Sequence, residues 1–196
     1  MSITEEAVEK RLQKKKEAQE IRTFKTTQRT FLMTSRFNTK TREENQKFRE
    51  KNWKNGCLYC CPQEVSQLIP LRAKMMVLEM DNDMNKIYAI GMCSNRSFIN
   101  KYAVYNNENY NRYNYIGKHR ILRSELSEFE EAVVKALDQL CFYGNEHMKR
   151  GQGLKSFPVK MLINCKSVID LTAFLESMFN KRFPDNNMKP DEPKEK

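Results

Sequence analysis

Residues 75–92, MMVLEMDNDMNKIYAIGM, decide the fold of this chain. Two short apolar segments, 75–80 and 86–92, flank a polar segment whose Asp and Asn residues are typical of turns. Their length and their Val, Ile and Tyr content predict strands rather than a helix. The stretch therefore predicts an antiparallel β-hairpin that belongs to a larger sheet.

The rest of the chain adds helices and short strands to this hairpin. Residues 124–144 show apolar side chains at helical spacing, acidic residues in the first turn and a glycine at the end. Residues 166–183 show a second amphipathic helical pattern, and residues 102–105, 113–116 and 157–163 predict strands. The fold class is α+β, with a small, mostly antiparallel sheet of four or five strands and two packing helices.

Both ends of the chain are charged and poor in apolar residues. Only 39% of the 196 residues are hydrophobic, so we expect a compact domain over residues 54–183 with an arm at either end. Residues 1–53 form the N-terminal arm, which begins with a helix, and residues 184–196 form a Pro/Asp/Lys tail of disordered type. No run of about 18 apolar residues exists, so no transmembrane segment is expected.

Residues 23–41 of the predicted arm contain large aromatic side chains but no clear periodicity. Phe24, Phe31 and Phe37 have no obvious local core to enter. We expect an extended arm that inserts these three side chains into neighbouring proteins. The alternative is that they pack under the compact domain, and the sequence does not decide between the two.

The tyrosine-rich stretch at residues 102–123 combines aromatic rings, asparagines and cations. Aromatic rings stack on flat groups, amides bind hydrogen-bonding edges and cations bind phosphates. A glycine loop at residues 149–153 adds two further cations that suit a phosphate. The predicted binding residues are Tyr105, Tyr110, Arg112, Tyr113, Tyr115, Lys118, His119, Arg120, Arg123, Lys149 and Arg150. The alternative is an edge hairpin whose tyrosines are half-buried.

The net charge of +10 indicates an anionic partner: nucleic acid, an acidic protein face or a membrane surface. The charge is uneven, since residues 124–148 carry one basic and six acidic residues, a net charge of −5. The alternative is that the positive charge only keeps the protein in solution.

Residues for catalysis or for a cofactor are few. His119 stands between Lys118 and Arg120 with no adjacent carboxylate, and the chain lacks the P-loop and the common hydrolase motifs. Three cysteines, Cys57, Cys60 and Cys61, are weak candidates for zinc because no second CxxC pair accompanies them. We therefore expect a protein that is not an enzyme and that holds no cofactor.

Residues 77–95, and YAVYNNENYNRYNYIGKHRI at residues 102–121, resemble a family of small basic proteins of nucleocytoplasmic large DNA viruses. The pattern is a Leu-Glu-Met strand, an Asn/Asp turn, an Ile-x-x-Ile-Gly strand, then Tyr-x-Val-Tyr, Tyr-Asn-Arg-Tyr and Gly-Lys-x-Arg-Ile. The resemblance implies a non-enzymatic minor capsid or virion protein of an icosahedral particle. Its partners would be other capsid proteins, and it would lie in the virion and, during assembly, in the host cytoplasm.

Two further resemblances imply other functions. The Ile-x-x-Ile-Gly strand, opening a basic hairpin, is similar to the PUA/EVE superfamily of small barrels that bind nucleic acid. This similarity implies a sheet that closes into a partial barrel, and a nucleic-acid-binding module as the alternative function. Tyr88-Ala89 and Tyr115-Ile116-Gly117 faintly resemble GIY-YIG nucleases. In that third hypothesis, Arg120 or Arg123 would act with Glu125, Glu128 or Glu130.

Overall fold

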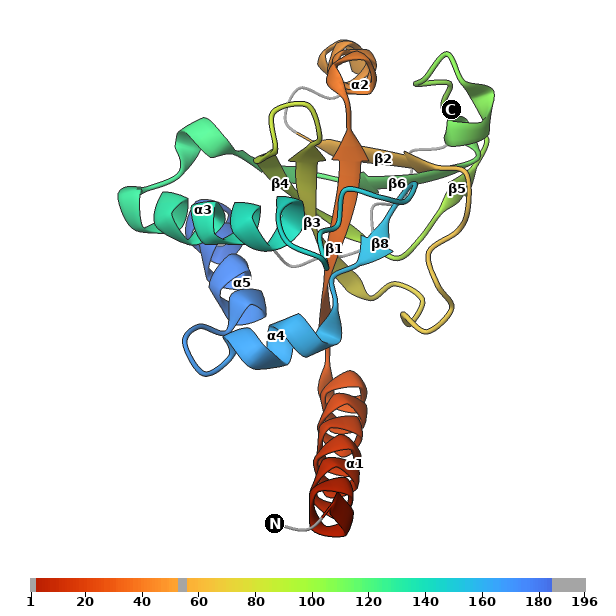
Figure 1. Cartoon of the computed structure of the whole chain (residues 1–196). Helices are drawn as coiled ribbons and strands as arrows, with labels where there is room; N and C mark the ends of the chain where they lie inside the picture. The colour runs from red at the N-terminus through yellow and green to blue at the C-terminus, as the bar shows by residue number, and fades with distance from the viewer. Residues whose placement is uncertain (1–2, 53–55, 185–196) are drawn as a thin grey trace.

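A five-stranded sheet forms the centre of the protein. The structure is a computed structural model that describes residues 3–52 and 56–184. The strands of the sheet, in the order β7-β4-β3-β1-β8, are β7 (His119–Leu122), β4 (Lys86–Ser94), β3 (Lys74–Asp81), β1 (Thr30–Phe37) and β8 (Lys155–Ser156). β1 and β3 pair in parallel, and the other three pairs of this sheet are antiparallel. Figure 1 shows helices packed beside the sheet, so the predicted α+β class is confirmed.

The predicted hairpin at residues 75–92 is confirmed as β3 and β4. The Asp81 side chain holds its turn, because Oδ1 accepts hydrogen bonds from the backbone N–H of Asp83 (3.0 Å) and of Met84 (3.1 Å). Asn85 has a φ of 51°, a left-handed conformation that asparagine tolerates better than most residues. The Asp and Asn residues of the turn thus help to fix which residues of β3 and β4 pair.

A second sheet of three strands crosses the first. It has the order β2-β6-β5 and consists of β2 (Cys57–Cys61), β6 (Tyr113–Gly117) and β5 (Phe98–Ile99). Two glycines allow the close approach of the sheets. A Cβ atom on Gly91 would lie 1.9 Å from the Tyr59 hydroxyl, and one on Gly117 would lie 1.8 Å from the Met92 carbonyl oxygen. No side chain fits at these positions, and the two sheets enclose a buried core between them, as a partial barrel does.

Three helices cover the other face of the five-stranded sheet: α3 (Glu128–Phe142), α4 (Val159–Cys165) and α5 (Leu171–Arg182). The two predicted helices are confirmed as α3, which Ser127 caps, and α5, which Asp170 caps. The predicted strand at residues 157–163 is wrong, since this segment contains α4. A short apolar run is compatible with a strand or with a buried helix. This one forms a helix, in which Leu162 packs in the core between the helices and the five-stranded sheet.

The predicted extended arm at residues 23–41 is also wrong, because this segment contains β1. Phe37 is buried in the core between the sheets, Phe31 packs partly buried against the same core, and Phe24 packs against the core under the helices. These three side chains therefore contact the protein's own domain. α2 (Thr39–Asn52) follows, so the compact domain begins near residue 30 rather than at residue 54.

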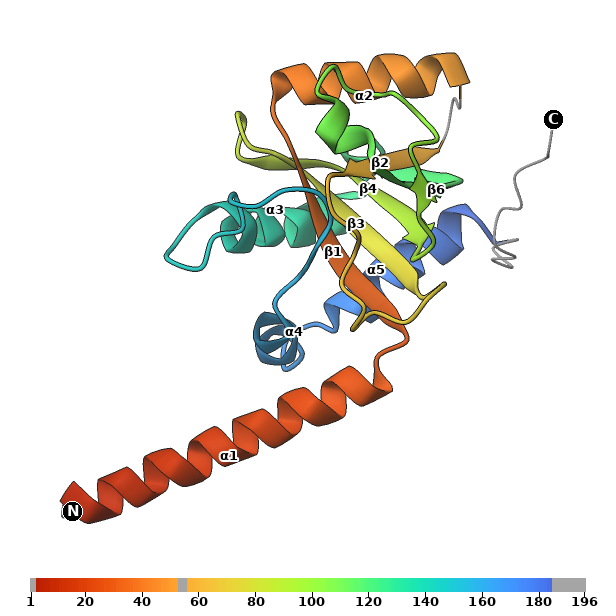
Figure 2. The same ribbon diagram turned by 90° about the vertical axis from the view of Figure 1, so that its right-hand side faces the viewer.

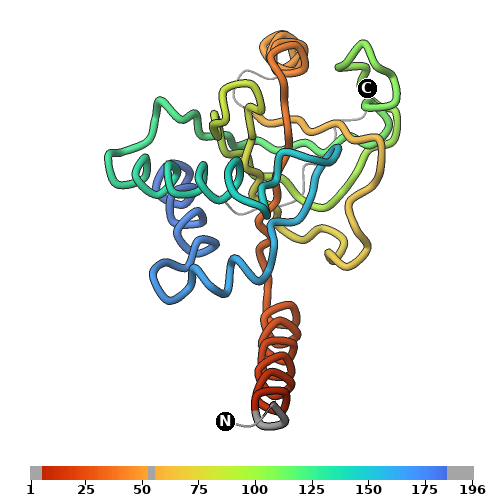
Figure 3. The backbone as a smooth tube through the Cα atoms, viewed as in Figure 1, coloured from red at the N-terminus to blue at the C-terminus, as the bar shows by residue number. Residues whose placement is uncertain are grey.

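α1 (Ile3–Thr27) projects from the domain, as Figures 2 and 3 show. Its C-terminal half contacts α4: Glu17 pairs with Lys160 at 3.5 Å, and the Lys166 ammonium lies 6.0 Å from the Phe24 ring centroid. The side chains of residues 6–16 are all exposed. Half of this helix thus has no support from the domain.

None of the helices in the described residues combines the length and the apolar character needed to cross a bilayer. Apart from Pro184, the predicted C-terminal tail lies outside the described residues.

Candidate binding site

Two buried asparagines hold the loop that precedes β6. Asn114 Oδ1 accepts a hydrogen bond from the backbone N–H of Tyr102 at 2.9 Å. Asn111 Oδ1 accepts from the backbone N–H groups of Val104 (3.0 Å) and Tyr105 (2.9 Å). The strand predicted at residues 102–105 is therefore wrong, because the side-chain amides of Asn111 and Asn114 bind the backbone N–H groups that a sheet would use. These two asparagines are structural, not ligand-binding.

The outer part of the same loop presents polar groups to solvent. A short 3-10 helix, η1 (Glu108–Asn111), is capped by Asn107, whose Oδ1 accepts a hydrogen bond from the Asn109 backbone N–H at 3.2 Å. Asn107 and Asn109 are exposed, and Tyr110 is half-buried. The Tyr110 ring meets the buried Tyr105 ring edge-on, at 6.2 Å between centroids and 80° between planes. This contact fixes the Tyr110 ring at the surface.

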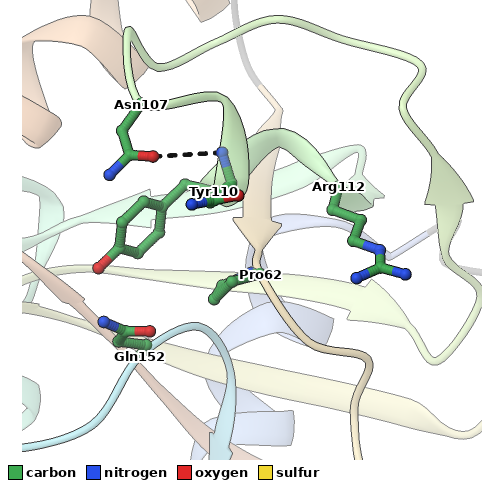
Figure 4. Close-up of a pocket in the computed structure, with 6 residues that line it drawn as sticks. Pro62, Asn107, Tyr110, Arg112 and Gln152 are labelled. Atoms are coloured by element: carbon green, nitrogen blue, oxygen red, sulfur yellow. Dashed lines mark hydrogen bonds between the residues drawn. The ribbon is translucent and has the colours of Figure 1, made fainter.

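A first hollow, of about 240 Å³, lies beside η1. Its lining residues are Pro62, Asn107, Asn109, Tyr110, Arg112 and Gln152. Figure 4 shows Tyr110 between Asn107 and Gln152 in this view, with Arg112 on the other side of Pro62. Gln152 belongs to the glycine loop at residues 149–153. The structure thus brings together the two segments that the sequence predicted to bind a ligand.

A second hollow, of about 420 Å³, lies on the other side of η1. Its lining residues are Asn100, Tyr102, Ala103, Glu108, Asn109, Asn111 and Arg112. Asn109 and Arg112 line both hollows. Arg112 is exposed, and its guanidinium carbon lies 5.5 Å from the centroid of the Tyr113 ring. We call these two cavities the paired hollows.

Two of the four tyrosines in the predicted site are unavailable to a ligand. Tyr105 and Tyr115 are 8% and 0% exposed. Their hydroxyls accept hydrogen bonds from Asn45 Nδ2 (3.1 Å) and from the Val65 backbone N–H (2.9 Å). Burial raises the pKa of both hydroxyls well above the usual value. Their assignment to the binding surface is wrong, because both rings pack in the core between the two sheets.

Arg120 of the predicted site is also unavailable to a ligand. Its side chain is 8% exposed, and Nη2 lies 2.8 Å from Oε2 of the buried Glu79. The Tyr59 hydroxyl donates to Glu79 Oε1 at 2.8 Å. Burial alone would raise the pKa of Glu79, but the charge and hydrogen bonds of Arg120 outweigh it and lower that pKa. Glu79 therefore stays ionised and holds the guanidinium inside.

Arg123 is held in the same way by two acidic residues of α3. Its Nη1 lies 2.7 Å from Asp138 Oδ2, and its Nη2 lies 2.8 Å from Glu131 Oε1. The Nη1 group also donates to the Ile87 carbonyl at 2.8 Å. The side chain is 17% exposed. A guanidinium with these partners holds the helix to the sheet and is not presented to a phosphate, so its predicted role is wrong.

Four of the five residues of the nuclease hypothesis take part in structural contacts of the same kind, and the fifth, Glu128, is exposed at the start of α3. Besides Arg120 and Arg123, Glu130 pairs with Arg182 at 2.6 Å. Glu125 Oε2 accepts a hydrogen bond from the Leu122 backbone N–H at 2.7 Å. Within the described part of the chain, these groups form separate structural contacts rather than one site.

The other predicted cations lie around the domain rather than at the paired hollows. Lys118 and His119 follow β6, whereas Arg112 precedes it, and the strand between them separates Arg112 from Lys118 by roughly 20 Å. The His119 ring packs against the Phe183 ring at 4.3 Å between centroids. Lys149 is half-buried and Arg150 is exposed, in the same loop as Gln152.

The three cysteines of β2 are buried in the core between the sheets. Cys57 Sγ donates to the Met92 carbonyl, and Cys60 Sγ accepts from Asn114 Nδ2 at 3.3 Å. Burial raises the pKa of the Cys57 and Cys61 thiols to about 12, which opposes the thiolate form that binds zinc. Among the described residues, no group of three His, Cys, Asp or Glu side chains is placed to hold a metal ion.

Sequence reasoning missed most residues of the paired hollows: Pro62, Asn100, Tyr102, Ala103, Asn107, Glu108, Asn109, Asn111 and Gln152. A signal for Gln152 existed, because it stands between Gly151 and Gly153, which have φ values of 107° and 65°. Two glycines in such conformations make a tight loop that exposes the residue between them. Pro62 had no comparable signal.

The chain was compared with protein-family models, with curated proteins and with solved structures, and none of these comparisons gave a match.

Proposed function

We propose that the protein is a non-enzymatic structural protein in which α1 attaches the compact domain to a neighbouring protein. The observation that carries this proposal is the projection of α1 from the domain, with residues 6–16 exposed. An isolated helix of this kind is marginally stable in water, and helices in proteins gain most of their stability from packing. A partner that covers α1 would supply that packing.

The exposed half of α1 indicates the chemistry of this partner. Val8 and Leu12 are 56% and 53% exposed, and residues four apart lie on one face of a helix. Lys10, Arg11 and the run of lysines at residues 14–16 surround them. A small apolar contact flanked by cations suits a shallow apolar groove with acidic side chains at its rim.

The resemblance of residues 75–123 to proteins of large DNA viruses supports a particular setting. In this proposal the neighbour is another capsid protein, the assembly is an icosahedral virion, and the host cytoplasm is where the two meet.

The test is incorporation of tagged protein into virus particles, measured as the fraction that sediments with them. Deletion of residues 1–16 leaves the contacts of Glu17 and Phe24 with α4 intact, so the domain still folds. A deletion to residue 40 would remove β1 and is not a valid test. We expect the shortened protein and the Leu12→Glu variant to lose incorporation.

The matched control is Val168→Glu, because Val168 is 89% exposed and lies outside α1. This variant keeps the incorporation of the unchanged protein. Normal incorporation of the shortened protein contradicts the proposal.

A second candidate function is binding of single-stranded nucleic acid, and one observation favours it. The hollow lined by Tyr110, Arg112 and Gln152 offers a ring, a cation and amides side by side, the three group types that bind unpaired nucleotides. The test is binding of labelled single-stranded DNA and RNA at increasing salt. Negligible binding at low salt contradicts this candidate.

A further inference from the structure

The paired hollows share one wall, and this geometry limits what fits them. Asn109 and Arg112 line both cavities, so Arg112 is shared by the two sites. Pockets for whole drug-sized ligands have volumes of about 300–1,000 Å³. The first hollow, of about 240 Å³, is smaller than this range, and the second, of about 420 Å³, is at its low end, so each suits one nucleotide rather than a whole dinucleotide cofactor.

Each hollow contains an aromatic ring with hydrogen-bonding groups beside it. The first has Tyr110 with the amides of Asn107 and Gln152. The second has Tyr102 with the Asn100 amide and the Glu108 carboxylate. A carboxylate repels phosphate but accepts hydrogen bonds from the exocyclic amino groups of bases. The second hollow is therefore suited to a base and not to a phosphate.

Arg112 differs from the other arginines of the tyrosine-rich stretch in its partners. Among the described residues, Arg112 pairs with no carboxylate, whereas Arg120 and Arg123 both do. Its guanidinium is exposed and keeps its donors for a ligand. Arginine binds phosphate through two parallel hydrogen bonds, which fixes the orientation of the phosphate as well as its position.

We propose that two successive nucleotides of a single strand occupy the paired hollows and that Arg112 binds the phosphate that joins them. The inference rests on the second candidate function, nucleic-acid binding. It adds that the smallest ligand is a dinucleotide and that the second hollow prefers a base with an exocyclic amino group. It also places one base on either side of Arg112, and we call this arrangement the two-nucleotide register. A duplex does not fit, because its bases are stacked and paired and cannot enter the hollows.

The experiment measures affinity as a function of oligonucleotide length. The probes are adenosine monophosphate, the dinucleotide ApA, oligoadenylates of three and six residues, oligouridylate of six residues, and a duplex of six base pairs. We expect ApA to bind at least about tenfold more tightly than the monophosphate, because it fills both hollows and gains the Arg112 contact. The third residue adds little, and oligoadenylate binds more tightly than oligouridylate.

Point variants separate the contributions of the two hollows. Arg112→Ala lowers the affinity for ApA by about tenfold, removes most of the difference between ApA and the monophosphate, and reduces the salt slope by about 0.7. Tyr110→Ala lowers affinity on the order of tenfold without changing the salt slope. Glu108→Gln reduces the preference for adenylate over uridylate. The matched control is Lys135→Ala, which removes one exposed cation from α3, away from the hollows.

The outcomes distinguish the inference from the function on which it rests. If no oligonucleotide binds, nucleic-acid binding and the inference both fail. If single strands bind but ApA equals the monophosphate, or if Arg112→Ala matches Lys135→Ala, nucleic-acid binding stands and the two-nucleotide register fails. Tight duplex binding likewise overturns the register. Circular dichroism and the melting temperature show that each variant is folded.

Discussion

Arg112 and Arg120 belong to one basic stretch, but they have opposite environments. Arg112 is exposed beside two hollows, whereas Arg120 is 8% exposed and paired with Glu79. The difference arises from β6, which separates the two ends of the stretch and leads one of them into the domain. A buried cation requires a buried anion, and an exposed one does not. The comparison teaches that only part of a basic sequence is available as a basic surface.

The largest expected effect comes from breaking the buried pair. Arg120→Leu leaves the Glu79 carboxylate buried without its partner, which lowers the free energy of unfolding by about 3–5 kcal/mol. Urea denaturation measures the loss. Replacing both residues, as Glu79→Gln with Arg120→Leu, restores part of the stability because no charge remains buried. A loss below about 1 kcal/mol for Arg120→Leu contradicts the structural role of the pair.

A smaller loss is expected at Arg123, which is more exposed than Arg120. Arg123→Leu removes hydrogen bonds to Asp138, Glu131 and the Ile87 carbonyl and lowers the free energy of unfolding by about 2 kcal/mol. Urea denaturation is again the measurement. The reference variant is Lys135→Ala, whose exposed contact with Glu131 contributes less than about 1 kcal/mol. Equal effects of the two variants would show that Arg123 is an ordinary surface cation.

The acidic partners of these arginines make stability depend on pH. Hydrogen bonds from Arg182 lower the pKa of Glu130 from its ordinary value of 4.5 to about 2, and the pKa of Glu79 and of Glu131 is also lowered. A carboxylate with a lowered pKa stabilises the folded protein above its ordinary pKa, and the contribution is lost as the pH falls toward the folded value. Stability should therefore fall between about pH 4.5 and pH 2.

The Arg182→Met variant isolates the share of Glu130 in this pH dependence. It raises the pKa of Glu130 toward the ordinary value, so the fall in melting temperature between pH 4.5 and pH 2 becomes shallower. Thermal melts at a series of pH values measure it. Arg112→Ala, in contrast, leaves the shape of the pH curve unchanged. A curve for Arg182→Met that overlays that of the unchanged protein argues against the lowered pKa.

The smallest expected effect on stability is at Arg112 itself. Arg112→Ala changes the free energy of unfolding by less than about 0.5 kcal/mol, because the side chain is exposed and lacks a carboxylate partner. Urea denaturation and oligonucleotide binding should then rank Arg112→Ala and Arg120→Leu in opposite orders, whereas Lys135→Ala has a small effect in both measurements. A loss above 1 kcal/mol for Arg112→Ala would make Arg112 a structural residue.

Local signals in the sequence were sufficient for the hairpin at residues 75–92 and for α3. The Asp and Asn residues of the turn and the capping and periodicity of α3 all act within a few residues. β1 had no such signal, because its parallel partner lies far along the chain: Thr30 pairs with Lys74. An arm and a central strand therefore looked alike in the sequence.

The same distinction explains what was missed in the binding site. The asparagines of the tyrosine-rich stretch look equivalent in sequence, but Asn111 and Asn114 bind backbone groups and Asn107 and Asn109 face solvent. Arg120 looked free because its partner, Glu79, lies 41 residues earlier. Which polar residues face a ligand depends on side-chain contacts that span 6 to 12 residues for the asparagines and 41 residues for Arg120, and sequence spacing does not record them.

The direct passage of α1 into β1 has a mechanical consequence. Only Gln28 and Arg29 separate the helix from the strand, so a pull on α1 reaches the first residue of β1 once the contacts of α1 with α4 are broken. β1 is bonded to β3 over eight residue pairs and to β8 on its other side. A load on the projecting helix would thus be resisted first by α4 and then by the hydrogen bonds of β1 with the strands on both of its sides.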